Sequence, residues 1–449
     1  MAALSRRDIR GKTQLYKNTR RYIQKMTEEK DLRAILVAVD SGSFNFEYML
    51  DEMKRLIKAC EMEVCGVLIQ TLANPNPATY IGSGKVYELK EQARILSANY
   101  CIIADNLSPA QLKNLTDTVD TAVLDRTGLI LEIFARRAKT REARLQVEAA
   151  NLNYLLPRLV GMRTSLGRQA GATGSLSNKG RGETQLELDR RHIERRLTEV
   201  RRELNSIDHD REVQRALRTK NDIPMVALVG YTNAGKSTLM NRLLTLNKTE
   251  EEKLVFEKDM LFATLDTTVR RIDCDDKKSF LLSDTVGFVS DLPHGLVKAF
   301  RSTLSEARNA DLLLVVLDSS DDYVREQLEV TEDTLKEIDC TGIPRIYVYN
   351  KCDKLPAVPA PGEHSKDRIY ISAKSGKNID ALTDLIKDEL YKENEIIEAT
   401  IPFDKGALLN LINETATVLE TDYSEKGTFI KAEVTKRLKG KLISEGINL

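Results

Sequence analysis

Tryptophan is absent from this 449-residue sequence, histidine occurs only four times, and no cysteine pair has the CxxC spacing. The histidines and cysteines show no pattern typical of a zinc site, so we expect reduced thiols. No run of about 18 apolar residues occurs, and no membrane-spanning helix is therefore expected. The opening residues, MAALSRRDIR, lack the apolar stretch of a secretory signal. These absences together predict a cytoplasmic protein.

Net charge is also lacking, because 68 basic residues balance 68 acidic ones. The balance conceals one basic segment: residues 136–182 hold ten Lys and Arg against two Glu, a net charge of +8. Its centre, 167–184, is rich in Gly and Ser and predicts a flexible loop. The flanks, 141–159 and 184–208, have helical apolar spacing and predict an antiparallel hairpin. Such a loop suits the phosphates of RNA, and a merely soluble loop is the alternative.

The rest of the chain predicts an α/β protein of several domains. Short apolar runs alternate with amphipathic segments up to residue 135, as in a small parallel α/β domain. The last residues read as strand 395–403, helix 406–420 and strand 427–435. We predict four parts: an N-terminal α/β domain at 1–135 with an extension at 1–30, the long helical hairpin at 136–222, an α/β domain with a mostly parallel sheet at 223–393, and a small C-terminal α+β domain at 394–449.

A phosphate-loop pattern, G-x-x-x-x-G-K-[ST], occurs at residues 230–237 as GYTNAGKS, between an apolar run and a helical segment. Its glycines let backbone N–H groups turn towards phosphates. Lys236 adds a positive charge, and Ser237 offers a hydroxyl to Mg²⁺. In this setting the pattern predicts nucleotide binding. The similar Gly82–Lys85 (GSGK) is followed by Val86 and follows no apolar strand, so we interpret it as a turn.

Two further loops make the nucleotide a guanine nucleotide. Asp284-Thr-Val-Gly287 follows an apolar run 47 residues after Ser237, where a carboxylate can hold Mg²⁺ through water and a glycine N–H can meet the γ-phosphate. Asn350-Lys-Cys-Asp353 follows another such run. The Asp353 carboxylate can accept from N1–H and the 2-amino group of guanine, and adenine has neither donor. Ser372-Ala-Lys374 is the expected loop behind the base. Together these loops predict that the domain at 223–393 is a P-loop GTPase domain.

The hydrolytic machinery is less complete. A threonine of segment 262–268 should reach Mg²⁺ and the γ-phosphate, and spacing alone does not choose among Thr264, Thr267 and Thr268. Phe288 stands where many small GTPases have a glutamine that orients water, so hydrolysis should be slow or completed by another element. Asn233 could hold a K⁺ ion that neutralises phosphate charge, or could be a turn residue. Asn233 and Lys236 are therefore our candidates for stabilising transition-state charge.

The residues predicted to contact GTP or GDP lie in these five loops. They are Gly230, Tyr231, Thr232, Asn233, Ala234, Gly235, Lys236, Ser237, Phe262, Ala263, Thr264, Leu265, Asp266, Asp284, Thr285, Val286, Gly287, Asn350, Lys351, Cys352, Asp353, Ser372, Ala373 and Lys374.

Seven segments together resemble the HflX family of ribosome-associated GTPases. They are residues 78–89, 125–159, 182–191, 230–243, 261–266, 283–304 and 350–353. The sequence departs from the family pattern at Arg181 and Thr267, where proline is common, and in residues 246–259, which look like an insertion.

The resemblance implies a GTPase that binds the large ribosomal subunit and its RNA and acts in ribosome splitting or rescue under stress. It implies that the glycine-rich loop reaches towards the peptidyl-transferase centre, and it selects Thr264 as a Mg²⁺ ligand beside Ser237. Ribosome-stimulated hydrolysis and a monomer are expected. Two alternatives stay open: a weakly hydrolysing RNA-binding switch, suggested by Phe288, and a GTPase of ribosome assembly or tRNA modification, which residues 78–191 do not support.

Overall fold

The computed structural model describes residues 32–42, 45–169, 179–220, 223–246, 268–274, 276, 278–290, 306–356, 367–424 and 427–448. For residues 160–169, 179–186, 208 and 210–220 only the backbone is described. The chain forms two compact units, one mainly of residues up to Glu212 and the other mainly of residues from Val213 onwards. The predicted extension at 1–30, most of the insertion at 246–259 and the threonine segment at 262–267 lie outside the described residues.

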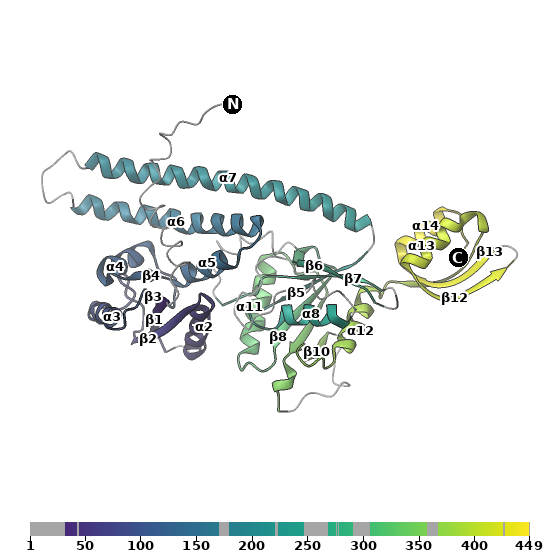
Figure 1. Ribbon diagram of the computed structural model, residues 1–449, viewed down its shortest axis with the longest axis horizontal. Coiled ribbons are helices and arrows are strands. Elements are labelled where there is room, and N and C mark those ends of the chain that lie inside the picture. The colour runs from purple at the N-terminus through teal and green to yellow at the C-terminus, as the bar shows by residue number, and fades with distance from the viewer. Residues whose placement is uncertain are drawn as a thin grey trace. The chain divides into compact units, whose positions relative to one another are not determined.

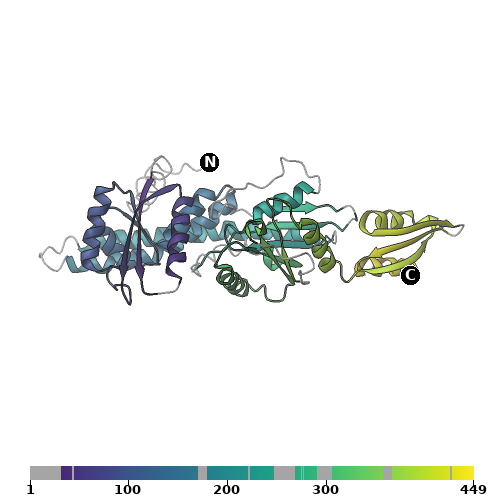
Figure 2. The ribbon, with the colours of Figure 1, turned by 90° about the horizontal axis from the view of Figure 1, so that it is seen from below.

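The first unit begins with a four-stranded parallel sheet in the order β2-β1-β3-β4. Its elements are β1 (Leu32–Asp40), α2 (Phe46–Ala59), β2 (Met62–Thr71), α3 (Ser83–Ile95), β3 (Tyr100–Ile103), α4 (Pro109–Val119), β4 (Ala122–Leu124) and α5 (Arg126–Arg137). Helices cover both faces of the sheet (Figure 2), which is why β1 is almost entirely buried. Ser108 caps α4 in a capping box with Gln111, and Pro109 lies in the first turn.

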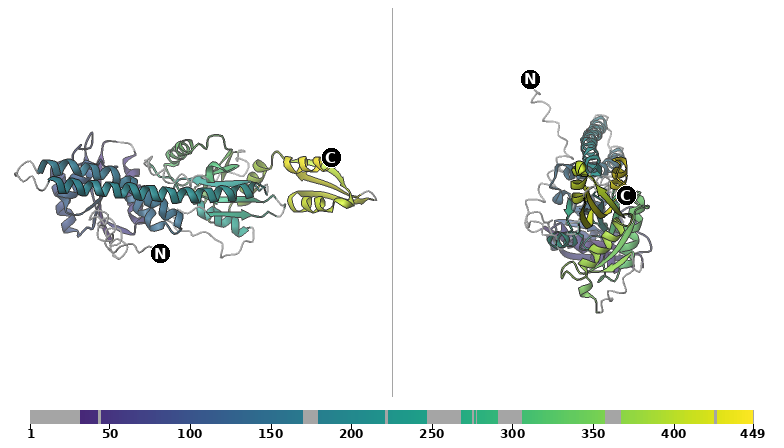
Figure 3. Two further views of the ribbon diagram at one scale, coloured as in Figure 1. Left: turned by 90° about the horizontal axis from the view of Figure 1, so that it is seen from above. Right: turned by 90° about the vertical axis from the view of Figure 1, so that its right-hand side faces the viewer.

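The predicted helical hairpin is formed by α6 (Arg141–Gln169) and α7 (Lys179–Lys220), which run side by side (Figures 1 and 3). Leu145 and Leu152 of α6 pack with Leu197 and Val200 of α7 in one apolar cluster. Arg196 binds the Glu148 carboxylate through two nitrogens, at 2.6 and 2.8 Å. Both helices extend further towards residues 170–178 than the sequence predicted, and those residues lie outside the described part.

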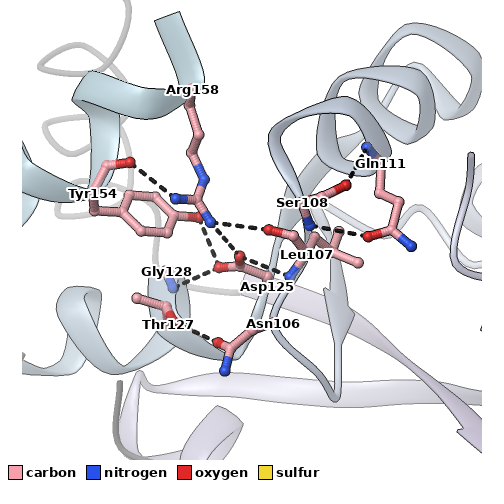
Figure 4. A network of polar contacts seen from close by, with 9 residues as sticks. All are labelled: Asn106, Leu107, Ser108, Gln111, Asp125, Thr127, Gly128, Tyr154 and Arg158. Atoms are coloured by element: carbon pink, nitrogen blue, oxygen red, sulfur yellow. Dashed lines mark hydrogen bonds and ion pairs between the residues drawn. The ribbon is translucent and has the colours of Figure 1, made fainter. Parts of the chain in front are cut away.

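The hairpin is attached to the sheet through the carboxylate of Asp125, which is fully buried at the end of β4 (Figure 4). Asp125 caps α5 by accepting from the Gly128 N–H at 2.8 Å. It also accepts from the Tyr154 hydroxyl at 2.7 Å and from Arg158 at 2.8 Å, both on α6. Because an ionised carboxylate can accept several hydrogen bonds, one side chain connects strand, cap and hairpin.

The second unit contains a six-stranded sheet in the order β10-β9-β8-β5-β7-β6, in which only β6 is antiparallel to its neighbour. Its elements are β5 (Met225–Gly230), α8 (Lys236–Leu246), β6 (Thr268–Ile272), β7 (Phe280–Asp284), β8 (Leu312–Asp318), α11 (Val324–Glu337), β9 (Arg345–Asn350), η2 (Cys352–Lys354), β10 (Arg368–Tyr370) and α12 (Ile379–Leu390). The three central strands are buried on both faces. Every predicted nucleotide loop in the described part follows the carboxyl end of a parallel strand, where α/β sheets bind ligands.

The last residues form an antiparallel sheet in the order β11-β13-β12, packed on α13 and α14. The elements are β11 (Glu395–Ile401), η4 (Phe403–Lys405), α13 (Gly406–Thr415), β12 (Thr417–Ser424), β13 (Gly427–Val434) and α14 (Lys436–Ser444). This agrees with the predicted α+β class. Throughout the described parts of the chain, no helix combines the length and apolarity needed to cross a membrane.

Two local predictions were wrong. The helix predicted over 406–420 ends at Thr415, and β12 begins at Thr417. Val418 and Glu420 pair with β13 there, and this pairing overrides the helical spacing. The GSGK segment is not a turn, because Gly82 is the N-cap of α3 and the helix starts at Ser83.

Candidate nucleotide-binding site

The phosphate loop connects β5 to α8 and uses its two glycines for close backbone approach. Gly230 has φ of +140°, and a Cβ atom there would lie 2.2 Å from the carbonyl oxygen of Val316. Gly235 has φ of +92°, and a Cβ there would lie 2.3 Å from Asn350 Nδ2. Only glycine fits both positions, so the loop can curl against the neighbouring strands β8 and β9.

Lys236, the first residue of α8, is buried in this loop. Its ammonium group donates to the carbonyl oxygens of Gly230, at 3.0 Å, and Tyr231, at 2.8 Å. A lysine has three N–H hydrogens, so one is left for a phosphate oxygen. Burial lowers the pKa of Lys236 to about 8, and the nearby Asp284 opposes part of that shift. Bound phosphate would further favour the charged lysine.

The side chains of Ser237, in the first turn of α8, and Asp284, at the end of β7, lie beside each other. Ser237 Oγ donates to Asp284 Oδ2 at 2.7 Å, although 47 residues separate them in the sequence. Asp284 ends β7, and its register beside Leu228 of β5 places it next to the loop. A hydroxyl and a carboxylate are the oxygen ligands that Mg²⁺ takes beside nucleotide phosphates. The two residues therefore fit a Mg²⁺ ion held directly or through water.

The residues after Asp284 turn back onto the phosphate loop. Thr285 donates through its hydroxyl to Leu228 O at 2.6 Å, and Thr285 and Val286 are both buried. Gly287 lies against Thr232, where a Cβ would be 2.8 Å from the Thr232 Cα. A side chain at position 287 would therefore push this segment away from the phosphate loop.

The Asn350–Asp353 segment is joined to the phosphate loop by two side chains. Asn350 donates to Ala234 O at 2.9 Å and accepts from the Ala373 N–H at 3.0 Å. Lys351, at φ of +62°, donates to Asn233 O at 2.8 Å and to Asp318 at 2.7 Å. Side-chain hydrogen bonds thus join the Asn350–Asp353 segment to the phosphate loop.

Asp353 is exposed and lies beside the loop of Ser372–Lys374. The hydroxyl of Ser372 hydrogen-bonds to its carboxylate and is the main cause that holds the pKa of Asp353 below its usual value, with smaller help from Lys374. The group is therefore ionised at neutral pH and can act only as an acceptor. Cys352 is fully buried and its N–H donates to Ile371 O at 3.0 Å, which supports the same turn.

Sequence reasoning missed Asp318, the last residue of β8. It lies beside Asn350 in the sheet and pairs with Lys351. A carboxylate directly after a buried strand of this domain was the available signal. Asn233 is half-buried with φ of +62°, which suits a turn asparagine. The predicted contacts from Phe262, Ala263, Thr264, Leu265 and Asp266 lie outside the described residues.

A central phosphate loop, an Asp–Gly loop on the neighbouring strand and an Asn-Lys-x-Asp loop at the same sheet edge define a P-loop GTPase domain. Protein-family models agree over three stretches. They are described as "GTP-binding GTPase N-terminal" at residues 47–135, "GTP-binding GTPase Middle Region" at 137–218 and "50S ribosome-binding GTPase" at 225–351.

Curated relatives are similar over most of the chain. The GTPase HflX of Caldanaerobacter subterraneus subsp. tengcongensis is 43% identical, with 94% of this chain and 95% of the relative covered. The GTPase HflX of Escherichia coli is 40% identical over 86% of this chain and 89% of the relative. A solved GTP-binding protein from Sulfolobus solfataricus with GDP is 26% identical, covering 80% of this chain and 99% of that one, with a TM-score of 0.43. This chain belongs to the HflX family of GTPases, as its sequence motifs indicated.

Proposed function

We propose that this GTPase acts on the large ribosomal subunit, where it splits or rescues ribosomes under stress. The main support is the match of residues 225–351 to a family described as 50S ribosome-binding. The basic segment 136–182, with its net charge of +8, offers a second contact, because clustered cations attract RNA phosphates. GTP would set affinity for the subunit, and hydrolysis would release the protein. A cytoplasmic monomer with the four predicted domains is part of this proposal.

Ribosome pelleting tests this proposal. More protein should sediment with large subunits in a non-hydrolysable GTP analogue than in GDP, and added subunits should accelerate single-turnover GTP decay. Sedimentation that is equal in both nucleotides, or absent, would contradict the ribosomal role. Accelerated decay would also exclude the alternative of a weakly hydrolysing RNA-binding switch.

A charge-matched pair of variants locates the contact. Replacing Arg168, Lys179 and Arg181 with glutamine should reduce sedimentation by about tenfold at moderate salt, because each phosphate contact contributes to a salt-dependent affinity. The control replaces three exposed lysines of the second unit, Lys336, Lys392 and Lys436. If both triple variants lose affinity equally, the basic segment is not the contact.

We further propose that the site binds GTP or GDP with Mg²⁺ held by Ser237 and Thr264. Mg²⁺ would neutralise charge on the outer phosphates. The geometry of Ser237 and Asp284 supports this. Hydrolysis without a glutamine at position 288 needs another source of charge stabilisation, and Lys236 and Asn233 are our candidates.

A K⁺ ion at Asn233 is the second part of that proposal. Single-turnover hydrolysis should be faster in potassium than in sodium buffer at equal ionic strength, and Asn233→Ala should remove the difference. GDP affinity, measured in both buffers, controls for loss of nucleotide binding. Equal rates for the unsubstituted protein in the two salts would leave Asn233 as a turn residue.

A further inference from the structure

The segment after the Asp284–Gly287 loop is paired with the phosphate loop through its backbone. The Phe288 N–H donates to Gly230 O at 3.1 Å, and the Thr232 N–H donates to Phe288 O at 2.8 Å. Tyr231 and Phe288 thereby form a parallel bridge between loops that lie 57 residues apart. The phosphate loop is therefore directly connected to the segment that must sense the γ-phosphate.

The side chain of Tyr231 extends this pairing by two residues. Its hydroxyl accepts the Ser290 N–H at 2.7 Å and shares a hydrogen bond with Ser290 Oγ at 2.6 Å. The Tyr231 ring is only 3% exposed, so the phenol is held in one orientation. One buried hydroxyl thus holds both the backbone and the side chain of Ser290.

These contacts hold residues 287–290 against the phosphate loop. A Cβ at Gly287 would be 2.9 Å from the Lys236 ammonium and 2.8 Å from Thr232 Cγ2. Gly287 is therefore held beside the group that binds the outer phosphates. The backbone pairing of Phe288 and the contacts between Tyr231 and Ser290 hold the residues that follow Gly287.

Phe288 makes this backbone position important for hydrolysis. Its side chain is 3% exposed and carries no polar atom, so it cannot orient water. The backbone groups of Phe288 and the Ser290 N–H are used in the contacts above. The Gly287 N–H is then the group of this segment that would meet the γ-phosphate, and it acts only when correctly placed.

We propose that Tyr231 is a positioning residue for GTP hydrolysis, which holds residues 287–290 against the phosphate loop through its hydroxyl contacts with Ser290. It acts through the backbone that it positions and need not touch GTP. This role concerns the intrinsic reaction and does not depend on the ribosome, so it is tested on the free protein.

The main test is Tyr231→Phe, which keeps the buried ring and removes the hydroxyl. The single-turnover rate with saturating GTP should fall roughly tenfold, because a less firmly held segment places its backbone less well for the transition state. GDP affinity should change less than twofold, because Lys236 and the base-reading loops keep their contacts. Hydrogen exchange should rise in peptides covering residues 284–290 and stay unchanged in β8. Tyr347→Phe is the matched control. Tyr347 lies on β9, and its phenol donates to the Glu332 carboxylate of α11 at 3.1 Å.

A double-mutant cycle with Ser290→Ala separates positioning from general stability. Ser290→Ala leaves the Ser290 N–H bond and should slow hydrolysis less than Tyr231→Phe does. In the Tyr231→Phe background it should add less than it does alone, because the shared contact is already gone. The proposal is overturned if Tyr231→Phe hydrolyses GTP at the normal rate. It is also overturned if GDP affinity and melting temperature fall together with the rate, or if the two effects add.

Discussion

Asp353→Asn should change the preferred base from guanine to xanthine. The Asp353 carboxylate is ionised and oriented by Ser372, so it presents acceptors to the two N–H donors of guanine. An asparagine keeps one acceptor oxygen and replaces the other with an NH2 donor group, which matches the 2-carbonyl of xanthine and opposes the 2-amino group of guanine. Sites built on such hydrogen bonds discriminate strongly, and the ratio of GTP to XTP affinity should fall by roughly 10⁴-fold.

Competition binding of labelled GDP against GTP and XTP measures this change. Asp333→Asn serves as the control, because that carboxylate lies on α11 with a side chain 75% exposed and pairs only with Lys336 among the ion pairs described. Continued selection of GTP over XTP by Asp353→Asn would falsify the base-reading role. Loss of both nucleotides would indicate that the substitution had disturbed the Ser372 loop instead.

Lys236→Met should weaken GDP binding by roughly 100-fold or more, the usual cost of truncating one partner of a buried charge-assisted contact. Methionine preserves most of the side-chain length and removes the ammonium. The phosphates then lose their cation, and the carbonyl groups of Gly230 and Tyr231 lose the donor that closes the loop. The loss of the cation acts on the bound state, so affinity for GTP, which has one more phosphate than GDP, should fall at least as far.

Isothermal titration with GDP, together with the melting temperature of the free protein, checks this prediction. Removing the buried charge relieves its desolvation, and this gain opposes the loss of the two hydrogen bonds to the loop carbonyls, so the melting temperature of the free protein should change little. Lys336→Met, at a lysine 62% exposed, is the control and should leave both quantities unchanged. A Lys236→Met protein that binds GDP normally would remove Lys236 from the phosphate site.

The nucleotide loops were predictable because their chemistry is local. Phosphate binding needs glycines, a lysine and a serine within eight residues, and residues 230–237 contain all of them. The parallel sheet was also predictable, since apolar runs without alternation indicate strands buried on both faces. The capped start of α4 follows from Ser108, Pro109 and Gln111, which lie within four residues of sequence.

The errors occurred where distant partners decide the conformation. Residues 417–420 continue a helical pattern, but pairing with β13 makes them a strand. The GSGK segment has turn composition, yet Gly82 begins a helix and its N–H donates to the Gln70 side chain on β2 at 2.8 Å. The two partners, β13 for residues 417–420 and Gln70 for Gly82, lie outside the segments whose conformation they decide.

By itself the sequence determined that this chain is a GTPase, because each of its motif loops carries its own chemistry, and segments such as residues 78–89 and 125–159 added the resemblance to the HflX family. Tertiary structure alone placed Ser237 beside Asp284, tied Asn350 to the phosphate loop and brought Tyr231 to Ser290. These contacts join residues from 47 to 116 positions apart. They depend on strand order and register, which a short motif does not encode.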